Sequence, residues 1–182
     1  GIILALALLL GPSARIPEIL RQPLTLAGTV QEPEALDGLL ERFGLKGWVR
    51  VIGPYDAQER RSLLQACRFV VMPSRIETFG MTIAEANAAS RLALVWDLAP
   101  MNEVASPQSP RARPFDIEGY AAEMRKLLEM PDPQLAALGE QARHHARRWD
   151  WDTAADAQER FYLEVMELHR TLRAPSNQRG HP

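Results

Sequence analysis

The sequence of 182 residues has few cysteines, no excess of basic charge and no long apolar run, and each of these absences excludes a class of protein. It contains a single cysteine, Cys67, so no disulfide can form within the chain and a disulfide-stapled secreted scaffold is excluded. Its formal net charge of −2 provides no basic surface of the kind that holds nucleic acid or an anionic membrane. No apolar run reaches the roughly 20 residues that a transmembrane helix needs. We therefore expect a globular, cytoplasmic protein.

The first ten residues contain no polar side chain. No basic stretch precedes this run and no A-x-A cleavage site follows it, so a signal peptide is the less favoured interpretation. We predict a buried helix here instead. Because the chain starts with Gly1 rather than methionine, we also expect that residues upstream of it are missing.

What the sequence does contain is an alternation of β-rich and helical patterns. A composition of 46% hydrophobic and 24% charged residues suits one globular domain of this length. Strands that are apolar on both faces and alternate with helices indicate βαβ units, and hence a Rossmann-like parallel sheet with helices on both faces. The predicted strands are Leu24–Ala27, Trp48–Ile52, Phe69–Met72 and Leu92–Trp96, and the predicted helices between them are Glu34–Phe43, Asp56–Cys67 and Gly80–Ala89.

Ligands of parallel sheets bind at the carboxyl ends of the strands. The loops that follow the predicted strands, at Gly28, Gly53, Pro73–Thr78 and Asp97, are therefore expected to form the rim of any binding site.

The pattern changes after Asp97. Residues 99–115 hold four prolines and are predicted to form an irregular loop. Three helices should follow: one over Ile117–Leu128, one opened by Asp132–Pro133, and one with an apolar stripe from Ala154 to Leu172. We assign residues 1–172 to one domain and residues 173–182 to a polar, disordered tail.

The segment after Met72 carries the most chemical information. A strand ends at Met72, a loop follows, and we expect a helix to start near Thr78 or Phe79, capped by the Thr78 hydroxyl. Gly80 in the first turn would leave the free backbone N–H groups open to a ligand. A helix start of this kind carries a partial positive charge and suits a diphosphate.

Glu85 is the only charged residue between Met81 and Ala89. It would lie two turns, about 10 Å, beyond Thr78, where ribose hydroxyls could supply the donors that its carboxylate needs. Glu77 would lie on the sugar side of the phosphates. The plainer alternative is that Glu85 pairs with a neighbouring cation and that Glu77 is solvated, and spacing alone favours it. Such an ion pair, or helix-start amides blocked by the protein itself, would argue against a nucleotide site.

The motif Pro73-Ser74-Arg75-x-Glu77-x-Phe79-Gly80, followed by Glu85-Ala86-x-Ala88, resembles the signature of the family-four retaining glycosyltransferases of GT-B fold, the "group 1" transferases. The similarity runs in order over residues 1 to about 170. It covers only the C-terminal, donor-binding half of the GT-B architecture, which ends in a helical segment.

The resemblance implies that the enzyme transfers a sugar from a nucleotide-diphosphate sugar to an acceptor with retention of configuration. Glu77 would be the catalytic contact to the sugar, and Glu85 would bind the ribose. It implies no metal and no other cofactor. The acceptor-binding N-terminal domain, through which any peripheral membrane association would occur, would be missing, so the chain alone would be inactive. The implied donor-binding residues are Ser74, Arg75, Phe79, Gly80, Met81, Thr82, Glu85 and Gly28.

The match has departures. The Arg and Lys with which the family neutralises the diphosphate would lie upstream of Gly1, and Ser90 and Leu92 stand where the family has Gly and Pro. Ala99–Asn102 replaces a Gly-Gly turn, and Pro100 has no N–H to offer. A catalytically silent GT-B scaffold or regulatory module is therefore the alternative. An unrelated flavodoxin-like domain is weaker, because the loop at Gly28 holds only one glycine.

Four aromatic residues lie in or near the last predicted helix. Trp149, Trp151, Phe161 and Tyr162 lie at helical spacing. We expect them to pack in a core or against another domain rather than to stack on a ligand.

Overall fold

The computed structural model describes residues 23–173. The chain divides into two compact units, the first ending at Ala146 and the second beginning at Arg147, and each is described separately. The predicted helix over residues 1–10 lies outside the described residues. So does the predicted tail, apart from Arg173, which ends the last helix.

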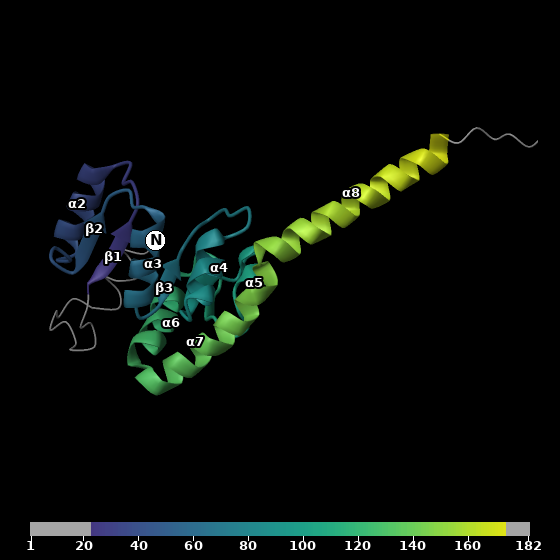
Figure 1. Cartoon of the computed structure of the whole chain (residues 1–182). Helices are drawn as coiled ribbons and strands as arrows, with labels where there is room; N and C mark the ends of the chain where they lie inside the picture. Colours follow the sequence, from purple (N-terminus) through teal and green to yellow (C-terminus); the bar gives the residue numbers. More distant parts are fainter. Residues whose placement is uncertain (1–22, 174–182) are drawn as a thin grey trace, which may run out of the picture. The chain divides into compact units, whose positions relative to one another are not determined.

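The strands described in the first unit pair in parallel, as predicted, and they form two sheets. Figure 1 labels three of them, β1, β2 and β3. One sheet pairs β1 with β2, and the other has the order β3-β4-β5. The four predicted strands are confirmed to within one residue at each end, and a fifth strand was not predicted. The strands are β1 (Leu24–Ala27), β2 (Val49–Ile52), β3 (Val70–Met72), β4 (Ala93–Trp96) and β5 (Arg111–Ala112).

The helices of the first unit follow the predicted pattern closely. A capping box opens α3, because the Asp56 side chain accepts from the Glu59 N–H at 2.8 Å and the Glu59 side chain accepts from the Asp56 N–H at 2.9 Å. The helices are α2 (Pro33–Arg42), α3 (Ala57–Ala66), α4 (Met81–Ala88), α5 (Met101–Val104), α6 (Ile117–Glu129) and α7 (Asp132–Ala146).

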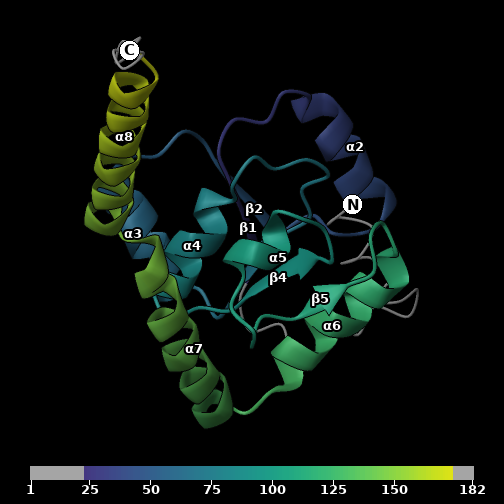
Figure 2. The same cartoon turned by 90° about the vertical axis from the view of Figure 1, so that its right-hand side faces the viewer.

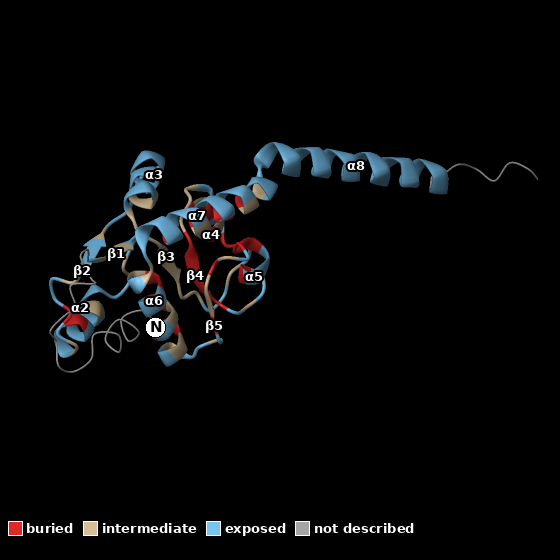
Figure 3. Cartoon of the chain, turned by 90° about the horizontal axis from the view of Figure 1, so that it is seen from below, coloured by how far each residue is buried: buried red, intermediate tan, exposed pale blue. Residues whose placement is uncertain are grey.

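The core of the first unit is centred on β4. All four of its residues are buried, as Figure 3 shows, because α4 packs against β3 and β4 while α6 packs against β4 and β5. α7 in turn lies along α4 (Figure 2). The same four residues are apolar, so their burial supplies the hydrophobic free energy that holds these helices on the sheet.

Tyr120, on α6, is hydrogen-bonded to two neighbouring strands, β3 and β4. Its hydroxyl donates to the Leu94 carbonyl at 2.8 Å and accepts from the Met72 N–H at 3.1 Å. Burial raises the pKa of the Tyr120 phenol, so the hydroxyl keeps its proton and remains a donor. Its ring lies 4.4 Å from that of Trp96. Tyr120 thus fixes the end of β3, from which the Pro73–Gly80 loop departs.

We predict that Tyr120→Phe lowers the free energy of unfolding by about 1–3 kcal/mol, because both hydrogen bonds disappear and two partly buried backbone groups lose their partner. Chemical denaturation measures the change. Tyr55→Phe is the control, since Tyr55 is exposed and should change stability by less than about 0.5 kcal/mol. Equal effects of the two substitutions would contradict the assignment.

Residues 99–115 are more ordered than the irregular loop that we predicted. They contain α5 and β5, and the Arg111 guanidinium holds the segment together. It donates to the carbonyls of Ser109 at 2.7 Å and of Ala105 and Ser106 at 3.2 Å. The prediction was wrong because it weighed only the prolines, whereas one cation satisfies three carbonyl groups here.

The turn after α4 has a backbone conformation that suits glycine, although a serine stands there. Ser90 has a φ of 59°, in the left-handed region where glycine is favoured. The next residue, Arg91, donates from its side chain to the carbonyls of Leu64 at 3.1 Å and Gln65 at 2.6 Å. These bonds hold the end of α3 beside the end of α4.

The second unit contains a short 3-10 helix, η1 (Arg147–Trp149), and the long helix α8 (Trp151–Arg173). α8 confirms the third predicted helix. The larger members of its predicted apolar stripe are exposed: Phe161, Val165, Leu168 and Leu172. No helix within residues 23–173 has both the length and the apolar character to cross a membrane.

Candidate functional site

α4 lies within one residue, at each end, of the predicted helix Gly80–Ala89, but it starts two to three residues after the start expected near Thr78 or Phe79. Gly80 is the N-cap, with φ 94° and ψ 49°, and the helix begins at Met81. Thr78 is exposed and does not cap the helix, so the predicted Thr78 cap is wrong. The left-handed conformation of Gly80 breaks the helix there, since no helical residue adopts it. Glu85 therefore lies only about 7.5 Å beyond Gly80 along the axis.

The backbone N–H groups at this helix start are open. Within the described part of the chain, those of Gly80, Met81 and Thr82 donate to no other residue, and the helical bonds begin with Ile83, whose N–H donates to the Gly80 carbonyl at 2.9 Å. Gly80 is buried, Thr82 is half-buried and Met81 is exposed. The α4 start therefore keeps the donors and the partial positive charge that suit an anion.

Glu85 is engaged in the ion pair that the plainer interpretation expected. Its Oε1 lies 2.9 Å from Nη1 of Arg60, on α3. The Arg60 and Glu85 side chains are 45% and 22% exposed. This observation weighs against a carboxylate kept free for ribose. Both side chains remain partly exposed, however, so the pair contributes on the order of 1 kcal/mol and is not a strong barrier to another partner.

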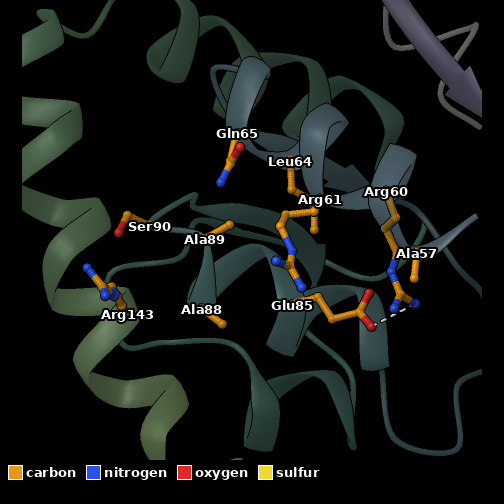
Figure 4. Close-up of a pocket in the computed structure, with 10 residues that line it drawn as sticks. All are labelled: Ala57, Arg60, Arg61, Leu64, Gln65, Glu85, Ala88, Ala89, Ser90 and Arg143. Atoms are coloured by element: carbon orange, nitrogen blue, oxygen red, sulfur yellow. Dashed lines mark ion pairs between the residues drawn. The ribbon is translucent and has the colours of Figure 1, made fainter.

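Arg60 and Glu85 lie on the wall of an open cavity of about 500 Å³ between α3, α4 and α7 (Figure 4). Arg61 and Arg143 line it as well, so cations outnumber carboxylates on its wall. Arg143 also approaches Glu140 at 3.8 Å. Neither Arg60 nor Arg61 belongs to the signature segment from Ser74 to Glu85, and neither does Arg143.

Glu77 and Ser74 lie in the loop between β3 and α4. Both are half-buried, and neither side chain makes a hydrogen bond or ion pair with another residue in the range 23–173. Within residues 23–173, no cation therefore competes with a ligand for the Glu77 carboxylate. Phe79 is half-buried between them and the start of α4.

Arg75 lies in the same loop, and its guanidinium lies 5.3 Å from the centre of the Phe115 ring. The Phe115 ring lies 6.1 Å from that of Trp96, so a cation–π contact and an aromatic pair connect the loop to the core. Arg75 is exposed and forms no ion pair with the described residues. It is neither buried nor committed to a carboxylate.

Gly28 lies apart from these residues in the fold. It follows β1, in the two-stranded sheet, where its N–H donates to the Ile52 carbonyl at 3.1 Å. Its φ of 118° requires glycine. No hydrogen bond or ion pair among residues 23–173 joins Gly28 to the segment from Ser74 to Glu85.

The Ala99–Asn102 segment leads into α5 rather than into an open turn. The N–H groups of Asn102 and Glu103 donate to the carbonyls of Leu98 at 3.0 Å and Pro100 at 2.9 Å. The Asn102 side chain donates to Asp97 at 2.5 Å. These amides are occupied by the protein itself, so this turn offers a ligand less than a Gly-Gly turn would.

Metal-binding side chains do not gather anywhere in residues 23–173: no three of His, Cys, Asp and Glu lie close enough to hold an ion. Cys67 is half-buried, and burial raises the pKa of its thiol. Its thiol donates to the Leu64 carbonyl at 3.4 Å. We assign no chemical role to it.

Solved structures with a similar fold are glycosyltransferases. The chain superposes on a glycosyltransferase from Rickettsia africae with a TM-score of 0.77 at 17% identity, over 90% of this chain and 44% of that one. It superposes on Anabaena HepE, solved in complex with UDP and glucose, with a TM-score of 0.68 at 22% identity, over 91% and 44% of the two chains. The fold is thus that of the C-terminal domain of GT-B glycosyltransferases.

Sequence comparison gives the family. The profile described as "Glycosyl transferases group 1" matches residues 2–145. A D-inositol 3-phosphate glycosyltransferase of Streptomyces bingchenggensis is 33% identical over 148 residues, covering 79% of this chain and 32% of that protein. A second one, from Catenulispora acidiphila, is 34% identical over 146 residues, covering 78% and 34%. The chain belongs to the group 1 glycosyltransferase family and spans about a third of the length of these relatives.

Proposed function

We propose that this chain is the donor-binding domain of a retaining glycosyltransferase that uses a nucleotide-diphosphate sugar. The observation that carries the proposal is the α4 start, where open N–H groups at Met81 and Thr82 lie between two carboxylates of the family signature. The diphosphate would bind the α4 start, Glu85 would bind the ribose, and Glu77 would contact the sugar.

In this arrangement the reaction depends on stabilising the charge of the departing diphosphate and on the position of the sugar relative to the acceptor. The bond between the sugar and the diphosphate breaks, and a bond to the acceptor forms on the same face of the sugar through an oxocarbenium-like state. The N–H groups of α4 would stabilise the negative charge that develops on the departing diphosphate. Glu77 would hold the sugar in place for the acceptor. None of these steps calls for a metal ion.

The acceptor would bind to a second domain. The chain spans about a third of its curated relatives, and the exposed apolar side chains of α8 suit a surface that another domain covers. We propose that the active cleft forms between that domain and the α4 start. Any attachment to a membrane periphery would belong to the same domain.

Calorimetric titration with uridine, guanosine and adenosine diphosphates tests the proposal. We expect at least one of them to bind the full chain weakly, with a Kd in the range of about 10⁻⁵–10⁻³ M, and we expect no sugar transfer by the chain alone. If none of the three binds, even after the chain is extended upstream, the nucleotide site is wrong.

The alternative is a silent scaffold of the same fold, and two observations favour it. Glu85 is paired with Arg60, and the amides at the start of α5 are occupied. Replacing each signature carboxylate in the longer protein separates the two functions. In a transferase we expect Glu77→Gln to lower kcat by at least about 100-fold and Glu85→Gln to raise the Kd for the nucleotide about tenfold. A scaffold would tolerate both changes without loss of its interactions.

A further inference from the structure

The ion pair between Arg60 and Glu85 bears on how a nucleoside is recognised. Arg60 reaches from the first turns of α3 to the middle of α4, and Nη1 lies 2.9 Å from Oε1 of Glu85 (Figure 4). The side-chain bonds of Arg91 hold the other end of α3. Arg91 thus holds the end of α3 beside the end of α4, and the ion pair adds a second contact between the two helices.

The contact leaves most of the carboxylate available. A carboxylate has two oxygens and about four lone-pair positions, and Arg60 contacts one oxygen only. The other oxygen, Oε2, accepts no hydrogen bond from the residues that the structure describes. Glu85 can therefore keep its ion pair and still accept from the hydroxyls of a ribose.

The pair also restricts a flexible side chain. Glutamate has three rotatable side-chain bonds, and a ligand that has to order them loses affinity. The cavity wall also includes Ala88 and Ala89, whose side chains offer no hydrogen bond, and Arg61, which forms no ion pair with Glu85. Among residues 23–173, Arg60 is the side chain that pairs with the Glu85 carboxylate.

We propose that Arg60 is a positioning residue that orients the Glu85 carboxylate to accept from the 2′- and 3′-hydroxyls of a nucleoside diphosphate. The inference rests on the proposed function and assigns a role to a residue outside the signature. If Arg60 instead competed with the ribose for Glu85, removing Arg60 would strengthen nucleotide binding rather than weaken it.

Arg61 provides a matched control. It is the next residue of α3 and lines the same cavity, but its side chain makes no ion pair or hydrogen bond with another residue of the described range. Arg61→Gln removes the same charge as Arg60→Gln without touching Glu85. A general effect of positive charge on the diphosphate would appear in both variants.

The test is calorimetry on the full chain with uridine, guanosine and adenosine diphosphates and with the 2′,3′-dideoxy analogue of each. We expect Arg60→Gln to weaken binding of the ribonucleotide about threefold to tenfold and to leave the dideoxy analogue unchanged. Arg61→Gln should not alter the ratio of the two affinities. In a Glu85→Gln background, Arg60→Gln should have no further effect, because the group that it positions is gone.

Three results would overturn the inference: tighter ribonucleotide binding by Arg60→Gln, an equal loss for ribo- and dideoxynucleotides, or the same loss in Arg61→Gln. If Glu85→Gln lowers the ribonucleotide affinity and Arg60→Gln does not, only the role of Arg60 is wrong. If the unaltered chain fails to distinguish the two sugars, the ribose role of Glu85 is wrong as well. Circular dichroism of each variant confirms that it is folded.

Discussion

Replacing Gly80 with valine is expected to weaken binding of a nucleoside diphosphate by at least about tenfold, or 1.4 kcal/mol. Gly80 has φ 94°, a conformation in which a β-branched residue is strongly strained. A Cβ atom at this position would also lie 3.0 Å from Cδ1 of Ile83. The α4 start would have to rearrange, and with it the N–H groups of Met81 and Thr82.

Titration with the three nucleoside diphosphates measures the loss, and Gly44→Val is the control. Gly44 has φ 64°, also in the left-handed region, and nothing lies within 4 Å of a Cβ built there. It follows α2, so its substitution strains the backbone without touching α4. The milder Gly80→Ala guards against a misfolded valine variant. Wild-type affinity in both Gly80 variants, or an equal loss in Gly44→Val, would refute a diphosphate site at the α4 start.

Gly139→Ala should cause the largest loss of stability. A Cβ on Gly139, in α7, would overlap the backbone carbonyl oxygen of Ser90 and lie 3.0 Å from its carbonyl carbon. Backbone atoms cannot move aside as a flexible side chain can, so α7 would have to move away from α4. We expect the free energy of unfolding to fall by about 2–4 kcal/mol.

Chemical denaturation of the variant measures this loss, with Gly38→Ala as the control. Gly38 lies within α2, and a Cβ there meets nothing within 4 Å. Alanine favours a helix by about 0.5–1 kcal/mol over glycine, so this variant should become slightly more stable. A Gly139→Ala protein as stable as the wild type would show that α4 and α7 pack less closely than described.

The sequence predicted the elements of the first unit well because their signals are local. The capping box at Asp56 and Glu59 determines where α3 begins, and both of its bonds are present. The apolar residues of β4 have only one stable place, between helices. Tertiary context decided the rest: α4 begins at Met81 because of the conformation of Gly80, and Arg111 orders residues that four prolines had marked as irregular.

The residues of the candidate site that lie close together in the sequence could be predicted, but the residue that reaches the site from another helix could not. The residues of one segment, from Ser74 to Glu85, could be found by their spacing and by their resemblance to a family. The partner of Glu85 could not, because Arg60 lies 25 residues earlier and reaches α4 only through the packing of α3. An arginine on a helix is ordinarily a solvated residue, and nothing local distinguishes Arg60 from Arg61.

The exposed apolar side chains of α8 favour self-association of this chain in solution. Phe161, Leu168 and Leu172 are each more than half exposed, and water is a poor solvent for such a stripe. At the concentrations that calorimetry requires, two molecules can shield these side chains by laying their α8 helices together. Dissociation of such dimers on dilution would then add its own heat to a calorimetric titration, so a dilution series should accompany every titration.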